Sequence, residues 1–168
     1  AETLDGEALD AAAEAVAENL GVSAADQNAP RSGDVADAVG HGDVSELVLV
    51  HGGGSFGHHH ASDAGVTTTA GTHDTADAIA IHSAMKALNQ FVLSRLHDRN
   101  VPALPVHPLS AGARDEQGDL SLPLEQVETM LGEGFVPVLH GDVIATAEEG
   151  VTVLSGDEIV TATASALD

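Results

Sequence analysis

The chain has 168 residues, of which 27 are acidic and 5 are basic, so its formal charge is -22 at pH 7. This balance argues against a nucleic-acid partner, because neutralising nucleic-acid phosphates requires basic patches. The sequence contains no cysteine, which excludes a disulfide framework and a thiolate nucleophile. No apolar run approaches the roughly 20 residues that span a bilayer, and no signal-peptide pattern opens the chain. We therefore expect a cytoplasmic protein with no membrane partner.

The acidic residues recur along the whole chain, and 43% of the residues are hydrophobic at periodic positions. This pattern indicates one folded core with a strongly hydrated surface rather than disorder. Lys86 is the single lysine, and only three residues are aromatic. Such a composition is typical of a halophilic protein, because a Debye length of about 3 Å at molar salt weakens repulsion between surface charges. We expect the fold to loosen at low salt.

The first predicted element is an amphipathic helix that Asp5 caps and Gly21 ends. Its apolar face carries Leu9, Ala12 or Ala13, Val16 and Leu20. Residues 23–42 are polar and aperiodic, which predicts a surface loop. A buried strand over 47–50 follows, and then a run of glycines over 52–54.

The remaining elements continue the alternation of helix and strand. They are a polar stretch over 62–72, a long amphipathic helix over 74–98, a strand over 101–106, a loop rich in Gly and Asp, a helix opened by Ser121 and Pro123 and ended by Gly132 and Gly134, a strand over 136–139, a hairpin over 143–154 that turns at 148–150, and a last helix that starts at Asp157 and still runs at Asp168. This order predicts an α/β fold, a three-layer αβα sandwich with a mostly parallel open sheet.

Three segments are predicted to lie at or just past the carboxyl ends of strands: 51–58, 140–142 and 155–157. Open parallel sheets bind ligands at that edge. We therefore expect these segments to converge on one cleft, although they are far apart in the sequence.

The segment LVLVHGGGSFGHHH, residues 47–60, has the layout of a phosphate cradle. Glycines let the backbone approach an anion, exposed amide N–H groups bind it, and a helix that begins just beyond adds its positive end. His58 is placed to donate a hydrogen bond to the same anion. The alternative is a tight structural turn, since the motif is neither a P-loop nor a dinucleotide fingerprint.

The whole string HGGGSFGH at 51–58, together with HGD at 140–142 and SGD at 155–157, resembles the isopentenyl phosphate kinases of the amino acid kinase superfamily, especially their salt-loving archaeal branch. The likeness continues through AMKALN, PALPVHPLSA, EGFVPVLHGDVI and LSGDEIV. It implies transfer of a phosphoryl group from ATP, with Mg²⁺ on the nucleotide, to isopentenyl phosphate in an archaeal mevalonate pathway. It also implies a homodimer.

The resemblance gives roles to five positions. Gly53 would contact the substrate phosphate, and Gly54 would approach the ATP phosphates. His58 would bind the substrate phosphate and stabilise the charge of the moving phosphoryl group, a role that suits phosphoryl transfer. Gly141 would be a further substrate contact, and Asp157 would orient the catalytic groups near the nucleotide.

Structural interpretations compete with these roles. Asp142 and Asp157 could be an Asx-turn and a helix N-cap. His107 and His140, flanked by apolar strand residues, are expected to be hydrogen-bonded structural histidines. His59 and His60 are expected to be bystanders, and the histidine run is not expected to bind a metal, because adjacent side chains point in different directions. One face of the long helix, with Ile81, Met85 and Leu88, is core and could also line a pocket for an isoprenoid tail.

The chain also departs from the family pattern. Members begin with a strand that ends in Lys-Gly-Gly-Ser, whose lysine bridges the two substrates, and they have a second half that binds most of the nucleotide. Lys86, on the long helix, replaces neither part. We therefore expect residues 1–168 to form a single partial domain, the acceptor-binding half plus the start of the nucleotide-binding half, with little activity alone. The alternatives are a superfamily kinase for fosfomycin, acetylglutamate, glutamate or UMP, and a non-catalytic phosphoanion-binding or regulatory module.

Overall fold

The computed structural model describes residues 5–22 and 47–167, so the predicted loop at 23–42 lies outside the described residues. The elements in chain order are α1 (Gly6–Asn19), β1 (Leu49–His51), α3 (Gly54–Asp63), α4 (Thr75–His97), β2 (Ala103–Val106), α5 (Pro108–Ala111), β3 (Ala113–Arg114), β4 (Leu120–Ser121), α6 (Glu125–Gly132), β5 (Val136–His140), β6 (Asp142–Thr146), β7 (Gly150–Leu154) and α7 (Gly156–Leu167).

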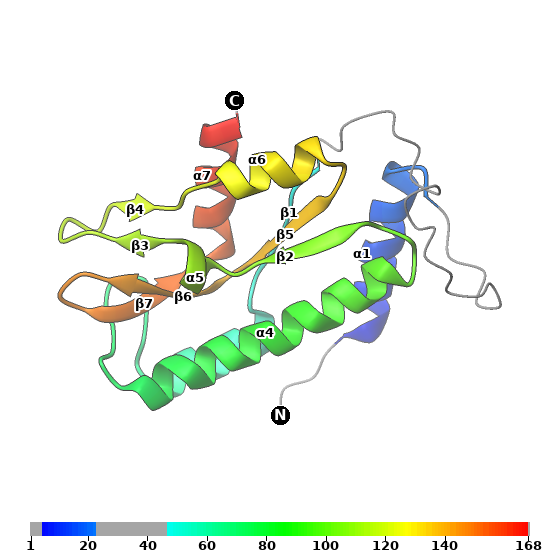
Figure 1. Cartoon of the computed structure of the whole chain (residues 1–168). Helices are drawn as coiled ribbons and strands as arrows, with labels where there is room; N and C mark the ends of the chain where they lie inside the picture. Colours follow the sequence, from blue (N-terminus) through cyan, green and yellow to red (C-terminus); the bar gives the residue numbers. More distant parts are fainter. Residues whose placement is uncertain (1–4, 23–46, 168) are drawn as a thin grey trace.

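The centre of the fold is a parallel sheet with the strand order β1-β5-β2. All five residues of the middle strand, β5, are buried. Val136 and Val138 pack with α1 and α4, whereas Leu139 packs with Val127 of α6 and Ile159 of α7. Alternate side chains of one strand thus enter two cores, which gives the three layers in Figure 1. The predicted α/β architecture is confirmed.

A second sheet, with the order β4-β3-β6-β7, extends beyond the central one. Strands β6 and β7 form the predicted antiparallel hairpin, and Glu148 and Gly150 take positive φ angles at its turn. Strands β3 and β4, inside the loop rich in Gly and Asp, were not predicted from the sequence. Each is two residues long, which is too short to show an alternating pattern.

The predicted N-cap of the first helix is confirmed, and the predicted long helix also begins at an aspartate cap. The Asp5 carboxylate accepts a hydrogen bond from Ala8 N–H at 3.0 Å, and the Asp74 carboxylate accepts one from Ala76 N–H at 2.7 Å. Gly21 has the left-handed φ of +68° that ends α1. Within residues 5–22 and 47–167, no helix has both the length and the apolar character that crossing a membrane requires.

The predicted start of α6 at Ser121 is wrong, and so is the interpretation of Asp157 as an N-cap. The predicted last helix is present as α7, and Asp168 lies outside the described residues. Ser121 does not open α6, because it pairs with Ala113 in the β3–β4 ladder. Asp157 does not cap α7. The cap is Ser155, whose backbone N–H donates to the Glu158 carboxylate at 3.0 Å while its hydroxyl accepts from Glu158 N–H at 3.3 Å. This reciprocal capping box satisfies two helix-end donors and leaves Asp157 free in the first turn.

Candidate functional site

The three segments that the sequence places at strand ends meet in the structure. A Cβ at Gly141 would lie 3.8 Å from Gly53 N and 3.5 Å from Gly156 N, and a Cβ at Gly156 would lie 3.6 Å from Gly52 Cα. Gly141 N–H also donates to His51 O at 2.9 Å. The backbones of the three segments are therefore in direct contact, and a Cβ at Gly141 or Gly156 would touch the neighbouring main chain at ordinary van der Waals distances.

Helix α3 begins inside the glycine run, with Gly53 as its N-cap. The first hydrogen bond of this helix joins Gly57 N–H to Gly53 O at 3.0 Å. The backbone N–H groups of the first turn of α3, before Gly57, have no acceptor within the helix, and they lie at its positive end. The glycines also have a structural use, because a Cβ at Gly53 or Gly57 would lie 3.1 or 2.7 Å from Met85 Sδ of α4. This turn packs against α4, and its amides have the chemistry to receive an anion.

His58 lies on α3, one turn after Gly54, and its side chain is exposed. Side chains on a helix lean toward its N-terminus, and residues four apart share a face. His58 therefore lies on the same face of α3 as Gly54. Its neighbour His59 lies on another face and pairs with Asp63 at 2.9 Å.

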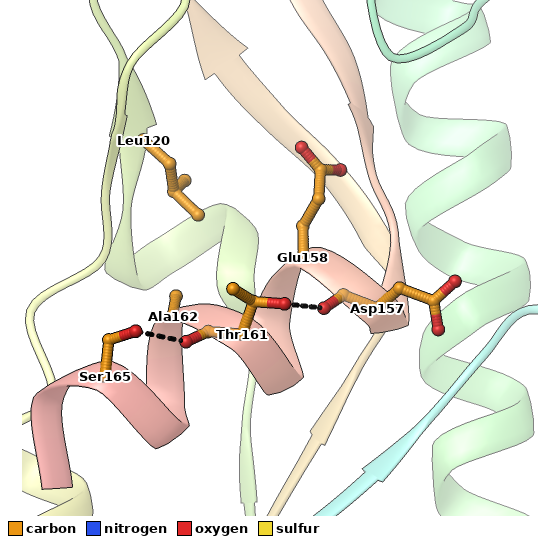
Figure 2. Close-up of a pocket in the computed structure, with 6 residues that line it drawn as sticks. All are labelled: Leu120, Asp157, Glu158, Thr161, Ala162 and Ser165. Atoms are coloured by element: carbon orange, nitrogen blue, oxygen red, sulfur yellow. Dashed lines mark hydrogen bonds between the residues drawn. The ribbon is translucent and has the colours of Figure 1, made fainter. Parts of the chain in front are cut away.

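Asp157 lies in the first turn of α7 and is exposed. It contributes to an open pocket of about 400 Å³ between α7 and β4, whose other lining residues are Leu120, Glu158, Thr161, Ala162 and Ser165. Figure 2 shows the Asp157 carboxylate turned away from Leu120. Among the described residues, no three His, Asp or Glu side chains are grouped so that they could hold a metal ion.

A row of histidines crosses the carboxyl edge of the parallel sheet. His51 ends β1, His140 ends β5, and His107 follows β2, so the three rings line up in strand order. The ring centroids of His51 and His140 are 5.6 Å apart, and those of His140 and His107 are 5.1 Å apart. This row of histidines was not predicted from the sequence. The available signal was that each of three neighbouring strands ends in, or is followed by, a histidine.

His140 is fully buried and neutral at pH 7. Its Nδ1–H donates to Gly141 O at 2.9 Å, so its Nε2 accepts from His107 Nδ1–H at 2.8 Å. Burial is the main cause that lowers the pKa of His140 to about 4, and the neighbouring rings of His51, His107 and His82 lower it further. Burial also lowers the pKa of His107, with His82 and Lys86 adding to the effect. The interpretation of His107 and His140 as hydrogen-bonded structural histidines is confirmed.

Asp142 is a buried partner of α4. Its side chain is 0% exposed, and its Oδ2 lies 2.7 Å from His82 Nδ1. Its Oδ1 accepts a hydrogen bond from Val143 N–H at 2.8 Å. Burial raises the pKa of this carboxyl group, although His82 and the Val143 amide oppose the rise. The interpretation of Asp142 as a simple Asx-turn is wrong, because its partner His82 is 60 residues away in the sequence.

An ion pair fixes the start of α7. Arg114 of β3, which is 8% exposed, donates to Glu158 at 2.7 Å. Burial alone would raise the pKa of Glu158, but hydrogen bonds from Ser155 and Arg114 hold it below its ordinary value. Because Glu158 also closes the capping box with Ser155, Arg114 positions the turn that carries Gly156 and Asp157. Arg114 was not predicted as a functional residue, because the two-residue strand β3 that carries it was not predicted.

The amino acid kinase family profile matches residues 9–168. The chain belongs to this family. Over 111 residues it is 59% identical to an isopentenyl phosphate kinase of Haloferax volcanii, a match that covers 66% of this chain and 45% of that protein. Over 121 residues it is 36% identical to an isopentenyl phosphate kinase of Arabidopsis thaliana, which covers 70% of this chain and 36% of that protein.

A solved structure from work on isopentenyl phosphate kinase has the same fold. It superposes with a TM-score of 0.73 at 22% identity, covering 95% of this chain and 58% of that one. This likeness supports the amino acid kinase fold that the sequence predicted. The chain spans about half the length of the relatives that it matches.

The low pKa of His140 predicts that acid destabilises the fold through this residue. In the unfolded chain the ring binds a proton below about pH 6.5, whereas in the folded chain it does so only near pH 4. Between these values the unfolded state binds more protons, so the free energy of unfolding falls as the pH falls, by about 3 kcal/mol for this group.

Urea unfolding in molar KCl from pH 7 to pH 4 measures this effect against His140→Asn, which keeps a donor for Gly141 O but does not titrate. We expect a shallower pH dependence for the variant. Parallel curves for the two proteins would show that burial of His140 does not control acid stability.

Proposed function

We propose that the protein transfers the γ-phosphoryl group of ATP to a phosphate oxygen of isopentenyl phosphate, which gives ADP and isopentenyl diphosphate. The observation that carries this proposal is the 59% identity to the Haloferax volcanii isopentenyl phosphate kinase. The convergence of Gly53, Gly141 and Gly156 on one edge of the sheet supports it, because these segments carry the motif on which the resemblance rests.

On the acceptor side, Gly53 N–H and the space beside Gly141 would receive the substrate phosphate. His58 would donate to that phosphate from the helix face above the same turn. Hydrogen-bond donors that are fixed before the reaction stabilise charge without reorganising during it. In phosphoryl transfer, such positioning and electrostatic stabilisation account for most of the catalysis.

On the donor side, the amide of Gly54 would face the ATP phosphates, and Asp157 would act near the nucleotide. The exposed carboxylate of Asp157 fits a role beside a nucleotide-bound Mg²⁺, since carboxylates suit this cation. The ion would neutralise charge on the transferred phosphoryl group. Gly54 has a φ of +47°, a conformation that glycine adopts readily and that sets the direction of the neighbouring amides.

We further propose a cytoplasmic homodimer that serves an archaeal mevalonate pathway in a salt-rich cell. The acidic composition and the Haloferax volcanii relative support the halophilic assignment. The family resemblance is the basis for the pathway and for the dimer.

The choice of acceptor is tested by assaying the full-length protein in molar KCl with ATP and Mg²⁺. We expect turnover with isopentenyl phosphate and none above background with fosfomycin, acetylglutamate, glutamate or UMP, because an acceptor site discriminates through the groups it is built to pair. Phosphorylation of one of the other acceptors instead would assign the protein to a different branch of the family. Binding of phosphate without turnover of any acceptor would favour the regulatory module.

His58→Ala tests the catalytic histidine. We expect kcat to fall about 100-fold, the usual effect of removing one fixed donor to a transition-state charge. The matched control is His59→Ala, which removes the adjacent ring and its exposed pair with Asp63 and should leave kcat unchanged. Equal rates for wild type and His58→Ala would remove His58 from the mechanism.

Gly141→Ala tests the cradle itself. The added methyl group would contact Leu154 O at an ordinary 3.4 Å, so we expect the fold to tolerate it, but it would lie 3.8 Å from Gly53 N. The KM for isopentenyl phosphate should rise about tenfold, since a displaced phosphate loses an amide hydrogen bond. Gly132→Ala, in α6 with open space around it, is the control and should keep the wild-type KM. An unchanged KM in Gly141→Ala would place the phosphate elsewhere.

A further inference from the structure

The His51 ring contacts the peptide group between Gly52 and Gly53, in the glycine run of the proposed phosphate site. Its Nδ1 lies 3.1 Å from Gly52 O, the carbonyl of the next residue. A carbonyl oxygen only accepts hydrogen bonds, so Nδ1 carries the proton and donates. The donor is therefore a side chain at the end of β1, and its acceptor belongs to the first glycine of the run.

That bond sets the direction of the next amide. The carbonyl of Gly52 and the N–H of Gly53 belong to one planar trans peptide group, in which the two bonds point in opposite directions. With the carbonyl fixed on the His51 ring, the Gly53 N–H points away from that ring. Gly53 N lies on the side where Gly141 approaches, 3.8 Å from the position of a Cβ there.

The His51 ring is itself held from α4. Its Nε2 lies 3.0 Å from the side-chain amide of Asn89, which is 1% exposed. The Nδ2 atom of Asn89 is buried without a partner among the described residues. With the Asn89 amide turned so that Nδ2–H donates to His51 Nε2, this buried donor is satisfied and Nδ1 is the ring nitrogen that carries the proton and donates to Gly52 O.

We propose that His51, anchored by Asn89, is a positioning residue that aims the Gly53 N–H at the acceptor phosphate. The inference rests on the proposed function for the identity of that acceptor. It explains why the polar side chain of Asn89 is buried beside the partly buried ring of His51, since burial of a polar group is costly unless the group is paired. The role is indirect, because neither side chain contacts the phosphate in this arrangement.

Two substitutions at His51 separate positioning from mere packing. In His51→Asn the amide nitrogen occupies about the place of Nδ1 and can still donate to Gly52 O. In His51→Gln the amide reaches the place of Nε2, toward Asn89, and the Gly52 carbonyl loses its donor. We expect the KM for isopentenyl phosphate to rise about tenfold in His51→Gln and about threefold in His51→Asn, with the KM for ATP unchanged in both.

Asn89→Leu removes the anchor with little change in volume, and we expect the same KM to rise about fivefold. The matched control is His97→Gln. The His97 Nε2 atom also lies 2.8 Å from a main-chain carbonyl oxygen, that of Ala103, but at the amino end of β2, away from the proposed site. The control should keep both KM values. Equal effects of His51→Gln and His51→Asn, or parallel changes in the KM values for acceptor and ATP, would overturn the positioning role.

A second measurement does not depend on turnover. In two-dimensional amide NMR, inorganic phosphate should shift the Gly53 N–H resonance in wild type and in His51→Asn, and shift it at least threefold less in His51→Gln. A Gly53 resonance that ignores phosphate in wild type would overturn the inference even if the kinase is active. A normal phosphate shift without phosphorylation of isopentenyl phosphate would instead refute the proposed function and leave the inference standing for another phosphate ligand.

Discussion

The site depends on one constraint, which is the close approach of three backbone segments at the carboxyl edge of the sheet. Gly52, Gly141 and Gly156 come within contact distance of one another's main chains, and Gly141 N–H bonds to His51 O. The phosphate site that we propose is therefore formed by main-chain groups, and the glycines leave room for an anion beside them.

Side chains of neighbouring elements hold each of these three segments in place. Helix α4 crosses the strand ends and contributes Asn89 to His51 and His82 to Asp142. The ion pair of Arg114 with Glu158 fixes the turn before α7 from the second sheet. Two of the three segments at the site are thus held by side chains of α4, and the third is held by a side chain of β3. Rigid supports of this kind keep donors in place while a substrate binds.

Most of the architecture could be predicted from the sequence, because the long elements have clear periods and caps. Asp5, Asp74 and the hairpin turn near Gly150 all behave as local chemistry dictates. The two-residue strands β3 and β4 carry no period, and the cap of α7 was misplaced because Ser155 and Asp157 are both good capping residues. Only the position of Glu158 three residues after Ser155 distinguishes them.

The glycines and His58 could be singled out from the sequence because they form one continuous motif. The polar pairs could not, since each joins residues 33 to 60 positions apart. Two of these contacts depend on how α4 crosses the sheet, and the third depends on the pairing of β2 with β5. A histidine after a strand has the same local sequence whether it is exposed or buried. Only the tertiary structure distinguishes His107 and His140 from the exposed His59.

A cradle of main-chain amides also suits the environment that the composition implies. Attraction between distant charges fades in concentrated electrolyte, and the chain has few cations with which to draw in an anion. Hydrogen bonds act at contact distance and are little affected by dissolved ions. The same ions mask the acidic exterior, which in dilute buffer would repel a phosphorylated metabolite before it reached the loop. At the proposed site, salt would therefore ease the approach of the anion without weakening the hydrogen bonds that hold it.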